Sequence, residues 1–232
     1  MTTPIDHPLA DRRALLLDFD GPVCAVFADY PAATAAAQLH AVIRDRLGHV
    51  PPDIASLTGH PLGILRRTAD LGDDELTRAV ADACRDAELT AVASAAPTPG
   101  AVDVLHAAHD SGCAVAIVSN NHADAIEKYL SAHDLLGYVG GIAGRTDGMD
   151  PRLLKPHPLL VTAGLATVNA QPADAVFVGD SETDIEAGRA AGVTTIGYAN
   201  KPGKRERLAD ADLVVDSLTP LVDAIRRLAA RP

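Results

Sequence analysis

Short apolar runs, separated by longer stretches with helical periodicity, dominate the chain. The runs over 14–17, 114–118 and 175–178 contain no charged residue, and each ends at acidic or small polar residues. Runs of this length are typical of parallel strands buried on both faces. The same pattern predicts further strands over 138–143, 193–197 and 213–215. Alternation of such strands with helices predicts an α/β fold with a mainly parallel sheet.

The connection after the first strand is much longer than the others. It holds roughly seventy residues of helical pattern, which is too long for an ordinary crossover. Helices are predicted there over 31–47, 62–70 and 73–95, and the Ala-Ala-Pro-Thr-Pro-Gly stretch that follows is typical of a linker. We therefore expect a helical insertion. Beyond it, helices are predicted over 101–112, 121–133, 159–167, 182–191 and 218–228.

Polar side chains follow three of the predicted strands. Asp18 and Asp20 come directly after the first strand, Ser119 and Asn120 after the second, and Asp180 after the third long apolar run. Ligands of open α/β sheets bind outside the carboxyl ends of the strands. These side chains, although distant in sequence, can therefore meet in one crevice.

The spacing of Asp18 and Asp20 places both carboxylates on the same face of an extended chain. Two carboxylates so close repel each other, which raises the pKa of one unless a cation lies between them. The pair therefore predicts either a shared proton or a bound metal. Asp180 and Asp184 offer further oxygen ligands, and an all-oxygen site suits Mg²⁺ better than zinc.

Four motifs, taken in order, resemble those of the haloacid dehalogenase-like hydrolases. The resemblance is to the branch with a helical cap after the first strand, which includes phosphoglycolate phosphatases and β-phosphoglucomutases. The motifs are Asp18-Phe19-Asp20-Gly21, Ser119 in Val-Ser-Asn, Lys155 in Lys-Pro-His-Pro, and Gly179-Asp180-Ser181-Glu182-Thr183-Asp184. The resemblance covers nearly the whole chain. It implies a Rossmann-like, doubly wound core of residues 1–23 and 98–232, with the cap domain at 24–97.

The same resemblance implies a role for each polar residue. Asp18 would be the nucleophile that forms an aspartyl-phosphate, and Asp20 the acid and base. Ser119 and Asn120, with N–H groups at the start of the following helix, would bind the phosphoryl oxygens. Lys155 would add a positive charge to the catalytic and substrate-binding residues.

The metal ligands follow from the resemblance as well. Mg²⁺ would be held by Asp18, by the main-chain carbonyl of Asp20 and by Asp180. Asp184 would act through water or by orienting Lys155. One arginine of the cap, Arg66 in our prediction, would contribute to substrate recognition.

Each motif on its own also has a structural interpretation. Asp20-Gly21 is a common turn pair, and Ser119 could cap the next helix. Lysines such as Lys155 are usually exposed, and an acid such as Asp184 is common in a first helical turn. The joint occurrence of the four motifs favours the functional interpretation.

Two features narrow the expected reaction within the family. Dehalogenases of the family lack the second aspartate, so Asp20 favours phosphoryl chemistry. No lysine precedes residue 122, which argues against the phosphonate-cleaving relatives, because they use a cap lysine.

Pro22 and Ala25-Val26 depart from the family pattern, and these departures concern the linker to the cap. We expect a Mg²⁺-dependent phosphatase acting on a small phosphorylated metabolite, such as a sugar phosphate or phosphoglycolate.

Other functions on a similar scaffold stay open. A phosphomutase of the β-phosphoglucomutase type would use the same residues but retain its phosphorylated intermediate. A non-catalytic binding protein on the same fold is another alternative. A signalling receiver domain is disfavoured by the long insertion and by Asp20. The segment 197–204 does not match a P-loop, because the spacing of its glycines is wrong and no Ser or Thr follows the lysine.

Composition limits the partners and the location. The formal net charge of −11 argues against general binding of nucleic acid or anionic membranes. No apolar run is long enough to cross a membrane, and no export signal is evident, so we predict a cytoplasmic protein.

Three cysteines without metal-ligand spacing are expected to be reduced thiols: Cys24, Cys84 and Cys113. The oligomeric state cannot be inferred from the sequence.

Overall fold

The computed structural model describes residues 5, 9 and 12–229, and within them six strands form one parallel sheet. The strands are β1 (Ala14–Leu17), β2 (Ala114–His122), β3 (Gly141–Arg145), β4 (Ala175–Gly179), β5 (Thr194–Tyr198) and β6 (Leu213–Val215). Their order in the sheet is β3-β2-β1-β4-β5-β6. This is the strand order of a Rossmann-like, doubly wound sheet. The predicted fold class is therefore confirmed.

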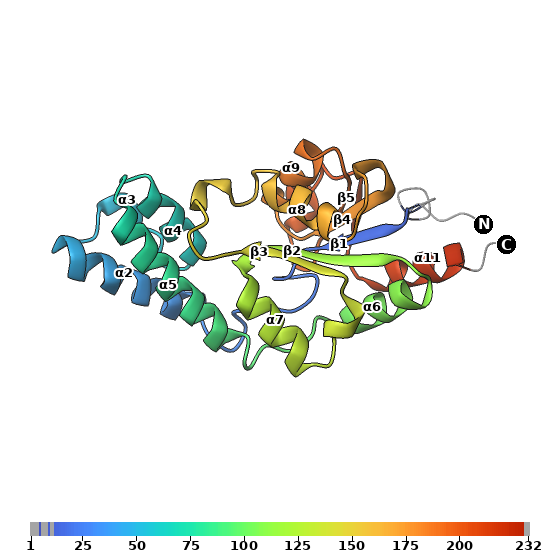
Figure 1. The fold of residues 1–232 in the computed structure, drawn as a ribbon, viewed down its shortest axis with the longest axis horizontal. Helices are drawn as coiled ribbons and strands as arrows, with labels where there is room; N and C mark the ends of the chain where they lie inside the picture. The colour runs from blue at the N-terminus through green and yellow to red at the C-terminus, as the bar shows by residue number, and fades with distance from the viewer. Residues whose placement is uncertain (1–4, 6–8, 10–11, 230–232) are drawn as a thin grey trace.

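Helices cover both faces of the sheet, as Figure 1 shows. One face carries α6 (Ala101–Asp110), α7 (Ala123–Ala132) and α11 (Thr219–Ala229), and the other carries α8 (Leu159–Thr167) and α9 (Glu182–Ala190). Side chains of β1 alternate between the two layers: Leu15 and Leu17 belong to the first apolar cluster and Leu16 to the second. Burial on both faces explains why β1 and β4 lack charged residues.

The connection between β1 and β2 is helical, as predicted, and we call it the cap. It contains α2 (Ala32–Leu47), α3 (Pro52–Ala55), α4 (Pro61–Ala69) and α5 (Asp74–Ala91). Their buried apolar side chains form a separate cluster, and the cap lies at the end of the sheet away from α6 and α11 (Figure 1). Cys24 and Pro97 form an isolated antiparallel bridge where the chain enters and leaves the cap. The domain boundaries at these positions stay a prediction.

One predicted element is wrong at a position that affects the site. The second strand does not end at Val118 with a helix from Asn121; β2 continues to His122, and α7 begins at Ala123. The extension is stabilised by pairing of His122 with Arg145 of β3, after a register shift beyond Val118. Ser119 and Asn120 therefore lie within a strand and not at a helix N-terminus.

Smaller differences concern the ends of elements. The predicted strand over 138–143 is displaced to Gly141–Arg145, and the helix predicted to continue to residue 95 ends at Ala91. The remaining short elements are η1 (Leu136–Tyr138), η2 (Pro151–Leu153), η3 (Pro172–Asp174) and α10 (Lys204–Arg207). All three cysteines are free thiols. Across residues 12–229, none of the helices has the length and apolar character needed to span a bilayer.

Candidate active site

Four of the predicted site residues meet where the order of the strands reverses: Asp18, Lys155, Asp180 and Asp184. β1 and β4 are neighbours in the sheet, but their crossovers leave in opposite directions, which opens a crevice at their carboxyl ends. Asp18 follows β1 directly and Asp180 follows β4. The topology therefore brings together two carboxylates that are more than 160 residues apart along the chain.

Lys155 lies at the centre of this crevice and is only 2% exposed. Its ammonium Nζ is 2.8 Å from Asp18 Oδ1 and 2.6 Å from Asp184 Oδ1, and it donates to the Val118 carbonyl at 3.1 Å. Two anionic partners offset the cost of burying one cation. They also raise the pKa of Lys155, against the effect of burial.

A reciprocal pair of hydrogen bonds holds the Lys155 loop against β2. The Lys155 N–H donates to Asn120 Oδ1 at 2.8 Å, and Asn120 Nδ2 donates to the Lys155 carbonyl at 3.2 Å. The Asn120 amide thus uses one donor and one acceptor on the main chain of Lys155. In this structure Asn120 positions the lysine, and its predicted contact with substrate stays untested.

Asp184 has hydrogen-bond partners on both carboxylate oxygens. Oδ1 faces Lys155, while Oδ2 accepts from the N–H groups of Asp180 and Ser181 and from the Ser181 hydroxyl. The last contacts form a capping box at the start of α9. The acid that caps α9 therefore also contacts the buried lysine, and a part for Asp184 in catalysis stays a prediction.

Three carboxylates of the site are close enough to share a cation. Asp18, Asp180 and Asp184 each offer an oxygen within 4.8 Å of the others. Hard carboxylate oxygens suit Mg²⁺, so the chemistry of this set fits the ion that the sequence predicts. Asp18 and Asp180 are the better placed to bind it, since both oxygens of Asp184 already have partners.

Two further side chains contact Asp180 that the sequence analysis did not select. Lys204 Nζ forms an ion pair with Asp180 Oδ2, and Asn200 Nδ2 donates to the same oxygen at 3.1 Å. Asn200 lies in the loop after β5, and Lys204 is the first residue of α10. Lys204 belongs to the segment 197–204, which does not match a P-loop. Its distance along the chain from the fourth motif gives no sign that it contacts Asp180.

Burial changes the acidity of the carboxylates. Burial, together with repulsion from Asp184, raises the pKa of Asp18, and the nearby Lys155 opposes this only in part. Burial also raises the pKa of Asp20 to about 6, although the Val26 N–H donates to Asp20 Oδ1 at 2.9 Å. A carboxyl group that titrates near neutral pH can both donate and accept a proton.

Ser119 is 1% exposed and bonded to Asn121. Its hydroxyl donates to Asn121 Oδ1 at 3.1 Å and accepts from the Asn121 N–H at 3.2 Å. Ser119 does not cap α7, since the side chain of His122 accepts from the N–H of Asp124 there. The backbone beside Ser119 is therefore extended, and the predicted helix N-terminus is not found there.

Arg66 of the cap helix α4 reaches the Lys155 loop. Its Nη2 donates to the Leu154 carbonyl at 2.8 Å and also to the Lys155 carbonyl. The neighbouring Arg67 is exposed and pairs with Asp70. Only one of the two arginines faces the core, as their 100° separation on a helix predicts. Contact of Arg66 with substrate stays a prediction.

The sequence did not predict a buried ion pair between the cap and the sheet. Arg145 Nη2 of β3 is 2.7 Å from Glu88 Oε2 of the cap helix α5, and the two side chains are 2% and 1% exposed. An isolated glutamate within an amphipathic helix gives no sign of such a partner. The apolar positions around Glu88 could have indicated that it lies on the buried face, but not which cation it meets.

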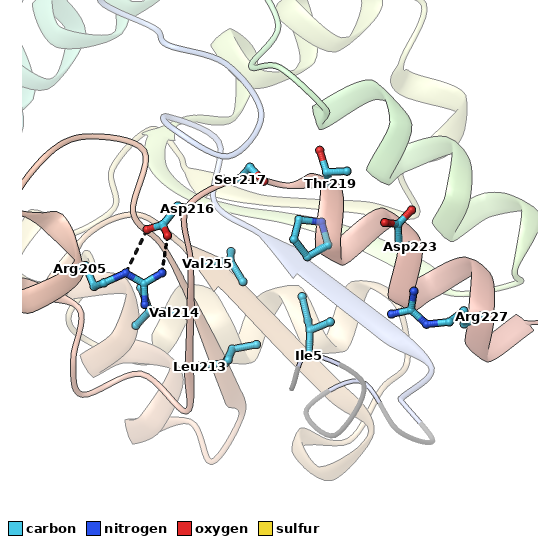
Figure 2. Close-up of a pocket in the computed structure, with 11 residues that line it drawn as sticks. Ile5, Arg205, Leu213, Val214, Val215, Asp216, Ser217, Thr219, Asp223 and Arg227 are labelled. Atoms are coloured by element: carbon cyan, nitrogen blue, oxygen red, sulfur yellow. Dashed lines mark hydrogen bonds and ion pairs between the residues drawn. The ribbon is translucent and has the colours of Figure 1, made fainter. Parts of the chain in front are cut away.

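A separate hollow of about 570 Å³ lies beside β6 and α11 (Figure 2). Its walls include Leu213, Val215 and Thr219, together with the ion pair of Arg205 and Asp216. None of the predicted site residues lines it. It is therefore distinct from the crevice at Asp18.

Comparison with known proteins identifies the class to which this site belongs. Residues 16–198, well over half of the chain, match the family model of the haloacid dehalogenase-like hydrolases. The chain is therefore a member of the haloacid dehalogenase-like hydrolase family. The match includes all four motifs and the whole cap.

Curated relatives within the family are phosphoglycolate phosphatases. The enzyme of Salmonella typhimurium is 31% identical over 129 residues, which cover 55% of this chain and 50% of that enzyme. The enzyme of Salmonella typhi is 29% identical over 196 residues, which cover 84% of this chain and 71% of that enzyme. The chain thus spans about half the length of the first of these relatives.

Solved structures show the same fold. A predicted phosphatase from Clostridium acetobutylicum has a TM-score of 0.69 at 20% identity, covering 93% of this chain and 99% of that one. A β-phosphoglucomutase from Clostridium difficile has a TM-score of 0.66 at 18% identity, covering 95% of this chain and 100% of that one. At these identities the likeness concerns the fold alone.

Proposed function

We propose that this protein is a Mg²⁺-dependent phosphatase that hydrolyses a small phosphorylated metabolite through an aspartyl-phosphate. The observation that carries the proposal is the convergence of Asp18, Lys155, Asp180 and Asp184 at the switch point of the sheet. Family membership and the phosphoglycolate phosphatases among its relatives support it. Phosphoglycolate is therefore the first substrate to test.

Asp18 would attack phosphorus with one carboxylate oxygen while the substrate's alkoxide leaves. Its Oδ1 contacts the Lys155 ammonium, so Oδ2 is the oxygen left to act as nucleophile. The Lys155 ammonium opposes the effect of burial on the pKa of Asp18, and it offsets the negative charge of the phosphoryl group. The covalent route divides one difficult displacement into two easier ones.

Asp20 would transfer the protons of both steps. Its raised pKa of about 6 allows it to be protonated when the alkoxide leaves and ionised when water attacks the aspartyl-phosphate. General acid–base catalysis of this kind contributes about 10²–10⁴-fold. The hydrogen bond from Val26 holds the Asp20 carboxylate in place for this role.

The metal would be bound by Asp18, Asp180 and the main-chain carbonyl of Asp20. When bound, Mg²⁺ would supply positive charge that stabilises the phosphoryl oxygens. Lys204 and Asn200, which contact Asp180, would hold that carboxylate in position. Asp184 would act on the metal only through water and on the reaction through Lys155.

Phosphate release from a panel of phosphorylated compounds tests this function. The panel contains phosphoglycolate and several sugar phosphates, each assayed with Mg²⁺ and with EDTA. We expect release with Mg²⁺, loss of release with EDTA, and background rates for Asp18→Asn. Asp110→Asn, which changes an exposed aspartate at the end of α6, serves as the matched control and should keep the wild-type rate.

Other outcomes identify the alternatives. Interconversion of sugar phosphates that a sugar bisphosphate activates, with little phosphate released, would establish a mutase instead. Binding of Mg²⁺ without turnover of any compound would indicate a binding protein. Turnover that persists in Asp18→Asn would refute the assigned nucleophile.

A further inference from the structure

A chain of buried polar side chains connects the cap to the serine of the second motif. We call Glu88, Arg145, Asn121 and Ser119 the Glu88 relay. Asn121 Nδ2 donates to Glu88 Oε1 at 3.2 Å, and Ser119 Oγ donates to Asn121 Oδ1 at 3.1 Å. All four side chains are at most 3% exposed. The relay is therefore shielded from bulk water.

The ends of the relay determine the direction of every hydrogen bond in it. Arg145 can only donate and the Glu88 carboxylate can only accept, so Arg145 Nη2 and the His122 N–H both point to Glu88 Oε2. The second oxygen, Oε1, must then face the NH₂ group of Asn121. This orients Asn121 Oδ1 toward Ser119, where it takes the only hydrogen of the hydroxyl group.

The orientation of this hydrogen affects the binding of a phosphoryl group. To donate to a phosphoryl oxygen, the Ser119 hydroxyl must turn away from Asn121, and Asn121 Oδ1 then loses a hydrogen bond in a buried place. Asn121 thus competes with the ligand for one hydrogen. Binding of the product, inorganic phosphate, is weakened by the same competition.

We propose that Glu88, Asn121 and Arg145 are positioning residues that orient the Ser119 hydroxyl and thereby keep the affinity for inorganic phosphate low. The inference rests on the proposed phosphatase function and extends it, because it makes product affinity depend on a residue of the cap. Weak product binding favours release of phosphate after each turnover.

The contacts of Arg145 make the link between Glu88 and Ser119 depend on the position of α5 against the sheet. Besides Glu88, its guanidinium donates to the Asn120 carbonyl of β2 and to the Ala81 carbonyl of α5, both at 3.4 Å. One cation is thus held by the cap and by the phosphoryl-binding strand together. Displacement of α5 would leave a buried charge without its partner, which is strongly unfavourable.

The variant Glu88→Gln tests the direction of the relay. The carbonyl oxygen of glutamine can keep the bonds from Arg145 and His122, and its NH₂ group then faces Asn121. The Asn121 amide must turn over to accept from it, so that Nδ2 donates to Ser119 Oγ. The Ser119 hydrogen is released, and we expect inorganic phosphate to bind about two- to tenfold more tightly, the worth of one hydrogen bond.

Two measurements report this change. Inorganic phosphate is titrated into the Mg²⁺-loaded protein by calorimetry, and its inhibition constant is measured against hydrolysis of p-nitrophenyl phosphate. Glu88→Gln is compared with wild type and with Glu127→Gln, a matched loss of charge at an exposed position on α7. The control should leave the phosphate affinity unchanged.

A double-mutant cycle separates positioning from a general disturbance. In a Ser119→Ala background there is no hydroxyl to release, so Glu88→Gln should no longer alter phosphate affinity. An equal effect in both backgrounds, or weaker phosphate binding in Glu88→Gln, would overturn the inference.

A second variant covers the case in which Glu88→Gln does not fold. Asn121→Ala keeps the ion pair of Glu88 and Arg145, and it also frees the Ser119 hydrogen. It should tighten phosphate binding in the same cycle, and unchanged or weaker binding would contradict the relay. If wild type neither binds phosphate nor hydrolyses any ester, it is the proposed function that fails.

Discussion

At the scale of single residues, two glycines make room for the site carboxylates because they have no side chain. A Cβ at Gly21 would come within 2.4 Å of the Asp180 carboxylate, and a Cβ at Gly179 within 2.3 Å of Asp184 Cβ. Gly21 also has φ of +124°, a conformation that residues with a side chain rarely adopt. Glycine at position 21 is therefore a requirement of the site and not only of the turn.

Gly21→Ala should disrupt the site more than it destabilises the fold. The new methyl group must displace Asp180, and a displacement near 1 Å can cost about 10²-fold in rate. We expect kcat/KM to fall by at least that order and Mg²⁺ affinity, measured by calorimetry, to fall with it. Gly112→Ala is the matched control, since Gly112 also has positive φ but no atom near its Cβ position.

The control should lose only stability. A left-handed conformation costs an L-residue about 1–2 kcal/mol, which a urea titration of Gly112→Ala would measure, while its kcat/KM stays at the wild-type value. Wild-type Mg²⁺ affinity in Gly21→Ala would show that Asp180 moves aside without consequence for the site.

At the scale of elements, helix α5 joins the cap to the core. Its apolar positions Leu76, Val80 and Cys84 lie on one face and are buried in the cap cluster, as their spacing predicts. Glu88 continues this face one turn beyond Cys84, but its position faces β2 and β3 and not the cap. The first part of the helix thus packs within the cap, and in its last part Glu88 bonds to β2 and β3.

The start of α5 should contribute to stability through its N-cap. Asp73 accepts a hydrogen bond from the Leu76 N–H at 2.9 Å, and loss of such a cap costs about 1 kcal/mol. We expect Asp73→Ala to lower the free energy of unfolding by that amount in urea titrations. Asp73→Ser, which retains a capping oxygen, should stay near wild type; equal losses in both variants would argue against the cap.

At the scale of the whole molecule, negative charge is in excess and part of it is concentrated at the site. The chain carries 31 acidic and 20 basic residues other than histidine. Burial raises the pKa of Asp18, Asp20 and Asp180 alike. Each of these groups favours its protonated form in the folded state, so ionising the site acts against folding.

The stability of the metal-free protein should therefore depend on pH through these groups. For Asp20 the pKa rises from 3.8 unfolded to about 6 folded, so the folded state binds more protons between these values. Its contribution is unfavourable once pH exceeds 3.8, grows as pH rises, and levels off above about 6. Relative to wild type, Asp20→Asn should gain stability over this range in EDTA.

Mg²⁺ should reverse the trend, because a cation favours the ionised carboxylates. A ligand at a hundred times its dissociation constant stabilises a folded protein by about 2.7 kcal/mol, so thermal unfolding at pH 7 should shift upward with Mg²⁺. The shift should be absent in Asp180→Asn.

The pH prediction for the metal-free protein has its own contrary outcome. If the difference in unfolding free energy between Asp20→Asn and wild type in EDTA does not change from pH 4 to 7, the raised pKa of Asp20 is contradicted.

Much of the architecture could be predicted from the sequence because its signals are local. Unbroken apolar runs predict buried parallel strands, and the long helical stretch after Leu17 predicts the cap. Asp18, Lys155, Asp180 and Asp184 were selected from motifs of a few residues, and the structure brings all four together. Their catalytic roles stay proposals until tested.

Tertiary structure alone decided the features that depend on partners far away in the chain. β2 extends to His122 because Arg145 and Glu88 bind its last residues, and these partners lie 23 and 34 positions away. Lys204 reaches Asp180 only because β4 and β5 are adjacent. Local patterns report which face of an element is buried. They do not report which charged group meets which, because hydrogen bonds between distant segments form only after the chain has folded.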